Sequence, residues 1–179
     1  MLSTELLGLD GVMLDEAKAY LRLELDEDDA PLGAIILAAI AHAERYTGLI
    51  LIRRGVKEVI TASSQWRRLG ALPVAGVTSV TGIPAEGATF VLPAANYGVD
   101  IDNDGEGYIR VTMAGSAGRV EIAYLAGLSP DWASLPESLR LGILRLVGHL
   151  YTHRDASDDP GPPMAVVALL RPWRRMKLS

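Results

Sequence analysis

Residues 135–154 read LPESLRLGILRLVGHLYTHR, and residues 165–175 read AVVALLRPWRR. Apolar residues of the first stretch recur at helical intervals, which predicts an amphipathic helix with one core-facing side. They are Leu139, Ile143, Leu146, Val147 and Leu150. The second stretch is apolar up to Leu170 and then turns aromatic and basic. Neither stretch has a recognisable catalytic pattern, so both indicate scaffold and interface rather than an active site.

Local signals set the boundaries of these two helices. Ser134 and Glu137 have the spacing of a capping box, with Pro136 in the first turn. Residues 156–163 are rich in Pro, Gly and Asp, which predicts a loop. A short last helix is expected from about residue 163 to residue 170, and Pro172 is expected to end it.

Two further helices are expected near the N-terminus. Residues 14–25 predict a short helix with Asp15 as its cap. Residues 31–47 predict a second helix, capped by Asp29 and ended by Gly48 in a left-handed conformation. This second helix is rich in Ala and Ile nearly all round, which is typical of a helix buried on more than one side.

Between these helical regions the hydrophobic period changes to two. Six short strands are expected, separated by Gly, Pro and Asn-Asp-Gly turns. They cover residues 56–61, 77–81, 90–92, 97–101, 108–112 and 119–125. The sequence therefore predicts an α+β fold: a helical bundle from residues 1–49 and 128–179, with an inserted antiparallel sheet or small barrel over residues 50–127.

Composition limits the classes of function. Hydrophobic residues make up 49% and charged residues 22% of the 179 residues, which excludes a disordered chain. The absence of cysteine excludes disulfides and thiolate metal sites. The longest apolar stretch, residues 32–41, is far shorter than the roughly 20 residues of a membrane span. With no secretory signal, the protein is expected to be made in a cytoplasm.

The charge of the chain is unevenly distributed. The net charge is −5, which argues against tight binding of a phosphate backbone by the whole surface. The last nine residues carry four basic and no acidic side chains, whereas the other 170 residues carry a net charge of −9. The densest acidic cluster is Glu24, Asp26, Glu27, Asp28 and Asp29. This asymmetry predicts a basic arm on an acidic body.

Two patterns resemble metal sites, but both favour a structural role. Residues 100–105 (DIDNDG) fit the first half of a calcium-binding EF-hand loop, but position twelve is Val111 instead of Glu. Asn103-Asp104-Gly105 is better explained as a hairpin turn that needs a positive φ. His149 and His153 have zinc-ligand spacing but lack a third ligand. No catalytic, metal or cofactor residue is therefore expected.

Two segments pair tryptophan with arginine, Trp66-Arg67-Arg68 and Trp173-Arg174-Arg175. Such pairs can stack on nucleotide bases. They are also typical of protein-interface anchors, or of a core tryptophan beside solvated arginines. For the second segment the interface interpretation is stronger, because it follows a helix-stopping proline close to the end of the sequence.

Four stretches, in this order, together resemble the phage head–tail connector (adaptor) family, which includes the adaptors of gene transfer agents. They are residues 14–23 (LDEAKAYLRL), residues 36–48 ending in AERYTG, residues 72–81 (LPVAGVTSVT) with Asn96-Tyr97, and the C-terminal LPE helix with ALLRPWR.

The resemblance implies a non-enzymatic virion protein in the neck, between capsid and tail, assembled in the bacterial host cytoplasm. It implies a homo-oligomeric ring, commonly twelvefold, between the portal protein and the stopper or tail-completion proteins. DNA would be transiting cargo in the ring lumen, and no membrane is involved.

The resemblance also implies that the C-terminal segment engages the portal. The residues expected to make this contact are Arg171, Trp173, Arg174, Arg175 and Lys177. The alternative is a DNA-binding or DNA-packaging accessory protein that uses the basic Trp-Arg-Arg segments and binds DNA in a salt-sensitive way. A metal-dependent enzyme built on residues 100–104 is a third hypothesis, and the missing twelfth ligand argues against it.

Overall fold

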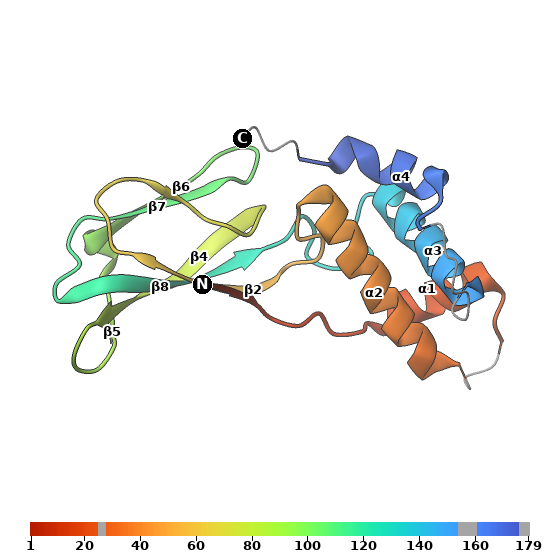
Figure 1. Ribbon diagram of the computed structural model, residues 1–179, viewed down its shortest axis with the longest axis horizontal. Coiled ribbons are helices and arrows are strands. Elements are labelled where there is room, and N and C mark those ends of the chain that lie inside the picture. Colours follow the sequence, from red (N-terminus) through yellow and green to blue (C-terminus); the bar gives the residue numbers. More distant parts are fainter. Residues whose placement is uncertain (25–27, 154–160, 176–179) are drawn as a thin grey trace. The chain divides into compact units, whose positions relative to one another are not determined.

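The computed structural model describes residues 1–24, 28–153 and 161–175. The chain divides into two compact units. The β unit contains Met1–Leu6 and Ile52–Leu128, and the helical unit contains Leu7–Leu51 and Ser129–Ser179. The described residues form four α-helices and two antiparallel sheets, whose arrangement can be followed in Figure 1. The predicted α+β class is confirmed, whereas separate domains over residues 1–49 with 128–179 and over 50–127 stay a prediction.

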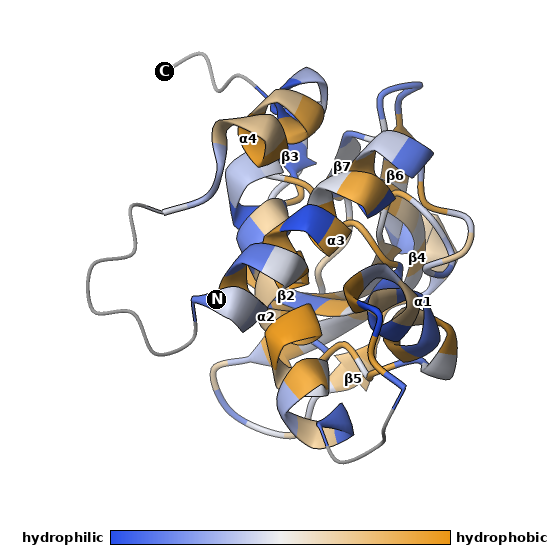
Figure 2. Cartoon of the chain, turned by 90° about the vertical axis from the view of Figure 1, so that its right-hand side faces the viewer, coloured by the Kyte–Doolittle hydropathy of each residue, from blue (hydrophilic) through white to orange (hydrophobic). Residues whose placement is uncertain are grey.

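The helical unit is a bundle of the two N-terminal and two C-terminal helices, as expected. The helices are α1 (Gly11–Leu21), α2 (Asp29–Thr47), α3 (Glu137–Thr152) and α4 (Met164–Leu170), followed by the 3₁₀ helix η2 (Arg171–Trp173). Helix α2 buries Leu32, Ile36 and Ile40 on a single face, so the expected burial on more than one side is wrong, although Figure 2 shows its hydrophobic colouring. The helix packs against α1, α3 and α4. Its opposite face is exposed, and the alanines there, Ala34, Ala38 and Ala41, account for the apolar composition all round.

Two predicted helix starts are wrong by part of a turn or more. Helix α1 begins at Gly11, and its cap is Asp10 instead of Asp15: the Asp10 carboxylate accepts a hydrogen bond of 3.1 Å from the Val12 amide. The early start brings Met13 into the core beside Ala17, one turn further on. In α2, Asp29 is the first helical residue instead of the cap. The predicted end is confirmed, since Gly48 has a φ of 74°.

The predicted capping box of α3 is also wrong. The Ser134 amide donates a hydrogen bond of 2.8 Å to the Asp131 carboxylate, so Ser134 belongs to the preceding turn. Hydrogen bonds from the Ser134 side chain and backbone lower the pKa of Asp131. Pro136 takes the position before Glu137, the first residue of α3. Proline lacks an amide proton and therefore suits a helix start without a side-chain cap.

A buried tryptophan joins the two halves of the helical unit. Trp132 is 1% exposed, and its indole Nε1 donates a hydrogen bond of 2.7 Å to Oε2 of Glu16 in α1. The Arg140 guanidinium lies 3.6 Å from the other carboxylate oxygen of Glu16. Residues from before and after the β insertion therefore meet in one polar contact.

The two chain segments that flank the insertion meet within the helical unit. The Ser129 amide donates a hydrogen bond of 3.0 Å to the Leu51 carbonyl. Leu51 and Ser129 are both buried. The insertion therefore leaves and re-enters the helical unit at neighbouring positions.

The β unit contains two antiparallel sheets (Figure 1). The five-stranded sheet has the order β1 (Leu2–Thr4), β2 (Arg54–Thr61), β8 (Ala117–Ala126), β4 (Val74–Pro84) and β5 (Phe90–Val91). The three-stranded sheet has the order β3 (Arg67–Arg68), β7 (Gly107–Val111) and β6 (Tyr97–Ile101), with the 3₁₀ helix η1 (Ala94–Asn96) before β6. In β8 the buried residues alternate: Val120, Ile122, Tyr124 and Ala126.

Of the two predicted β architectures, the sheet is confirmed and the barrel is wrong. Each sheet keeps two edge strands within the described residues, so neither closes on itself. Strands β1 and β3 were not expected from the sequence. Strand β1 lies next to β2, more than fifty residues along the chain, where Leu2 pairs with Glu58.

Tyr124 predicts an alkaline loss of stability in the β unit. Burial raises its pKa above the usual value of about 10, and its hydroxyl accepts from the Ala71 amide (3.1 Å) and donates to Glu58 (3.0 Å). Above about pH 10 the unfolded tyrosine loses its proton while the folded one keeps it, so stability falls as pH rises. The free energy of unfolding of wild type and of Tyr124→Phe is measured by denaturant titration at several pH values above about 10. Plotted against pH, the two free energies should differ in slope by up to about 1.4 kcal/mol per pH unit. Parallel slopes would contradict this role.

Candidate functional site

The C-terminal segment is held on the helical unit as far as Arg175. Val166 and Leu170 of α4 are buried, and the chain continues without a break into η2. Helix α4 ends at Leu170, as the sequence predicted, and Pro172 lies in the 3₁₀ turn that follows. Trp173 is half-buried, and its indole Nε1 donates a hydrogen bond of 3.1 Å to the Ser138 hydroxyl of α3. Trp173 is thus an anchor within the chain's own bundle.

The two residues after Trp173 contact the C-terminal end of α2. The guanidinium of Arg174 lies 5.4 Å from the centre of the Tyr46 ring, a cation–π geometry. The Arg175 amide donates a hydrogen bond of 2.9 Å to the Thr47 carbonyl, one of the last carbonyls of α2. Positive charge is favourable at this end of a helix because the helix dipole places partial negative charge there.

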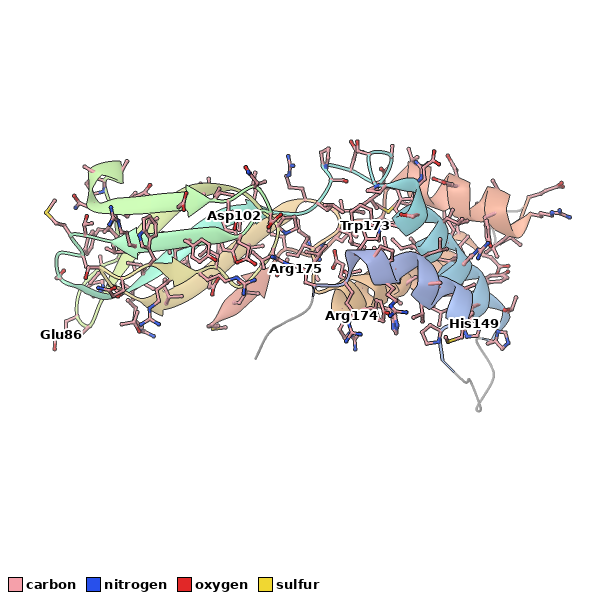
Figure 3. All side chains as sticks on the ribbon, turned by 90° about the horizontal axis from the view of Figure 1, so that it is seen from above. Glu86, Asp102, His149, Trp173, Arg174 and Arg175 are labelled. Carbon is pink, nitrogen blue, oxygen red and sulfur yellow. The ribbon has the colours of Figure 1, made fainter. Side chains whose placement is uncertain are left out.

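The segment brings together four of the five residues predicted to form the contact surface. Arg171 and Arg174 are exposed, whereas Trp173 and Arg175 are partly buried. Lys177 lies outside the described residues. Figure 3 labels Trp173, Arg174 and Arg175 on this segment. The arrangement exposes the guanidinium groups of Arg171 and Arg174 on a segment that is held by hydrogen bonds to Ser138 and Thr47. Residues 171–175 of the predicted basic arm are therefore not a free tail.

The other Trp-Arg-Arg segment forms a platform on the three-stranded sheet. Trp66 is 45% exposed, and the Arg110 guanidinium lies 4.7 Å from the centre of one of its rings. Gly98 of β6 makes room for the indole, since an added Cβ would come within 3.3 Å of Trp66 Cη2. The sequence pointed to Trp66 but missed Arg110 and Gly98. Their signal was the alternation of β7, which places Arg110 opposite the buried Ile109 face.

The acidic segment at residues 100–104 is a turn between β6 and β7. The Asp102 carboxylate accepts hydrogen bonds from the amides of Asp104 (3.0 Å) and Glu106 (2.7 Å). Gly105 has the positive φ, 74°, that the sequence predicted for this turn. Across the residues that the structure describes, no three Asp, Glu or His side chains gather closely enough to hold a metal ion.

The histidine pair lies at the end of α3. The rings of His149 and His153 are 4.4 Å apart between centroids, and Nδ1 of His153 lies 2.9 Å from the His149 carbonyl oxygen. Thr152 Oγ1 is also 2.9 Å from this nitrogen. The geometry is that of a helix end with ring–backbone hydrogen bonding, in agreement with the structural role expected from the sequence.

Comparisons with known proteins bear on the whole fold. Residues 12–68 match the family model described as phage gp6-like head–tail connector protein. No curated relative matches the chain. Three solved structures cover 100% of this chain, and 97% of each of their own chains is matched.

These structures all come from gene transfer agent (GTA) particles. One is the neck of an empty particle computed with C6 symmetry (28% identity, TM-score 0.82). Another is the virion of a native particle (29%, 0.80), and a third is the neck of a native particle computed with C12 symmetry (29%, 0.77).

The fold and the matches define a head–tail connector-like structural protein. The resemblance to the phage head–tail connector family is confirmed by the family model and by the full-length structural matches. The predicted location in a virion neck agrees with the particles from which the similar structures come. None of the described helices is both long and apolar enough to cross a membrane.

Proposed function

We propose that this chain is a non-enzymatic adaptor that forms a ring in the neck of a virion, between the portal protein and the stopper or tail-completion proteins. Genome DNA passes through the lumen of the ring. The observation that supports the proposal is the match of the entire chain, both units included, to chains from the particles described above. A match limited to the helical unit would have left the role of the β unit in such an adaptor without support.

The proposed ring is a twelvefold assembly of identical subunits. Head-to-tail contacts between unlike surfaces close into a ring when the rotation between subunits divides a full turn evenly. The C6 and C12 symmetries used for the similar necks support a ring whose order is a multiple of six. The acidic excess of the first 170 residues suits a lumen that does not neutralise phosphates, so DNA slides without sticking.

We assign the portal contact to the C-terminal segment, with Arg171, Trp173, Arg174, Arg175 and Lys177. Exposed Arg171 and Arg174 supply charge, and the hydrogen bond from Trp173 to Ser138 fixes the segment on α3. Positive groups on a fixed support steer association and set orientation towards an acidic partner surface. Trp173 is therefore a positioning residue for the two arginines.

Electron microscopy of the purified protein, alone and mixed with its portal, tests the proposed function. We expect twelvefold rings, or added density that caps the portal. A protein that stays monomeric and leaves portals uncapped would contradict it. Retention on DNA that is lost between about 50 and 200 mM salt, without portal capping, would favour the DNA-binding alternative. Trp173 argues against that alternative for the second segment, because its indole is already hydrogen-bonded within the bundle.

The double variant Arg171→Glu with Arg174→Glu should weaken portal attachment at least tenfold. It reverses two exposed charges while leaving Trp173 and the α3 contact in place. A deletion of residues 171–179 is less informative, because it also removes the Trp173 packing. The measurement is co-sedimentation with portal over a concentration series.

A charge-matched control uses two other exposed arginines, Arg119→Glu with Arg145→Glu. It makes the same change in net charge at other places on the surface, and we expect near wild-type attachment. Equal attachment by both double variants would show that the C-terminal segment is not the portal contact.

A further inference from the structure

The three-stranded sheet has two edges of opposite charge. Edge strand β3 consists of Arg67 and Arg68, and both are exposed. The opposite edge strand, β6, carries Asp100, and the turn that follows it adds Asp102 and Asp104. We call Arg67 and Arg68 of β3, together with Arg110 on the outer face of the central strand β7, the basic edge, and Asp100, Asp102 and Asp104 the acidic edge. Within the described residues, β3 and β6 are each paired with β7 alone.

The basic edge is supported from the outer face of the sheet. Arg110 lies on the exposed Trp66 ring, which crosses the sheet as far as Gly98 of β6. Arg68 forms an ion pair of 3.0 Å with Glu106, so part of its charge is balanced within the sheet. Arg67 pairs with Ile109 in the ladder and is exposed at the edge. Tryptophan and arginine together are the residue types most enriched at the centres of protein interfaces.

The acidic edge is built differently but is equally accessible. Asp100 and Asp104 are exposed, whereas Asp102 uses one carboxylate oxygen to hold the turn. Val99 and Ile101, on either side of Asp100, are each 38% exposed. The edge thus combines carboxylates with partly exposed apolar side chains, which is the composition that an arginine- and tryptophan-bearing surface complements.

We propose that the basic edge of one subunit docks against the acidic edge of a second copy of this chain. The inference rests on the proposed ring and names a surface that closes it. Strands lie roughly 4.8 Å apart, so the edge strands β3 and β6 face away from each other across a sheet roughly 10 Å wide, with Arg110 between them. Unlike patches on opposite sides of one subunit are what a head-to-tail contact requires. Opposite charge gives that contact its direction and register.

The same charges have one other physical role that the experiment separates from docking. Charged residues on edge strands also prevent unwanted strand pairing between molecules. In that role, reversing one edge would not weaken the ring. In the docking role, reversing one edge places like charges against each other and the ring is lost.

The test uses two double variants and their combination. The basic-edge variant carries Arg67→Glu and Arg110→Glu, and the acidic-edge variant carries Asp100→Lys and Asp104→Lys. Arg68 and Asp102 stay unchanged because of the Glu106 ion pair and the turn hydrogen bonds. Circular dichroism and thermal melting check that each variant is folded. Rings are counted by electron microscopy, alone and on portals.

We expect each double variant by itself to lose rings at least tenfold. Mixing the two should restore rings of alternating subunits, because each reversed edge then meets an edge of opposite charge and twelve is an even number. The chain that carries all four substitutions should also assemble. Trp66→Ala should weaken assembly without restoring either variant.

Three results would overturn the proposal. Double variants that assemble like wild type would show that the edges lie outside the contact. Loss of rings in both variants without rescue, in the mixture or in the fourfold variant, would show that the edges do not meet. Failure of the wild type itself, alone and with portals, would overturn the proposed ring and this surface with it. If the wild type forms rings and the variants form them equally well, the proposed ring stands and only this docking surface is overturned.

Discussion

Replacing Trp132 with alanine is expected to lower the free energy of unfolding of the helical unit by about 3–5 kcal/mol. Trp132 is among the largest fully buried side chains, with 1% of its surface exposed. The substitution leaves a cavity and removes one partner of the partly buried Glu16 carboxylate, which loses its 2.7 Å hydrogen bond and keeps Arg140 as a partner. Denaturant unfolding followed by the helical circular dichroism signal measures the change.

Two matched variants separate the contributions. Trp66→Ala removes the same side chain from a site that is 45% exposed, and we expect a loss below about 1 kcal/mol. Trp132→Phe keeps an aromatic ring but removes the indole N–H, and we expect an intermediate loss of about 1–3 kcal/mol. A Trp132→Ala variant as stable as Trp66→Ala would show that this core does not depend on the tryptophan.

The second large effect is expected at Gly127, immediately after β8. Its φ is 151°, and an added Cβ would collide with the backbone of Arg53, at both the nitrogen and the Cα. Backbone atoms cannot move aside as a flexible side chain does, so the segments at residues 53 and 127 would have to separate. We expect Gly127→Ala to destabilise the β unit by about 3 kcal/mol, measured by thermal unfolding.

Gly118 provides the control for Gly127. It lies near the beginning of β8, and an added Cβ there meets no atom within 4 Å. Gly118→Ala should therefore be neutral or stabilising by about 0.4–1 kcal/mol, because alanine restricts the unfolded chain. If Gly127→Ala and Gly118→Ala melt at the same temperature, the close approach of Gly127 to the Arg53 backbone does not contribute to stability.

Local patterns predicted the parts of the fold that rest on local interactions. The apolar stripe predicted for α3 is confirmed at Leu139, Ile143, Leu146 and Val147, because burial sets the period, but Leu150 is only partly buried and the stripe missed the buried Leu144. In β8 the buried residues alternate as the period of two predicts. Helix starts were harder because several acidic residues compete for each cap, as Asp10 and Asp15 do in α1. Strands β1 and β3 pair with strands far along the chain. They contain only three and two residues, which is too short for an alternating hydrophobic pattern to be recognised in the sequence.

The candidate site shows the same division. The sequence pointed to the Trp-Arg-Arg segments, whose residue types are typical of interface anchors, of stacking on bases, or of a core tryptophan beside solvated arginines. The sequence could not show that Trp173 is hydrogen-bonded to Ser138, thirty-five residues earlier, or that Arg110 lies on Trp66. These contacts are tertiary, and they decide which arginines remain available for a partner.

The hydrogen bond between Ser129 and Leu51 has a consequence for how such proteins diversify. To the four helices, residues 52–128 are a loop whose ends are already adjacent. The entropy of closing a loop grows only with the logarithm of its length, by about 0.6 kcal/mol for each doubling. The helical frame therefore tolerates insertions of very different size at this place with little change in stability. Selection is free to shorten, lengthen or exchange the insertion to suit a new neighbour while the frame stays constant.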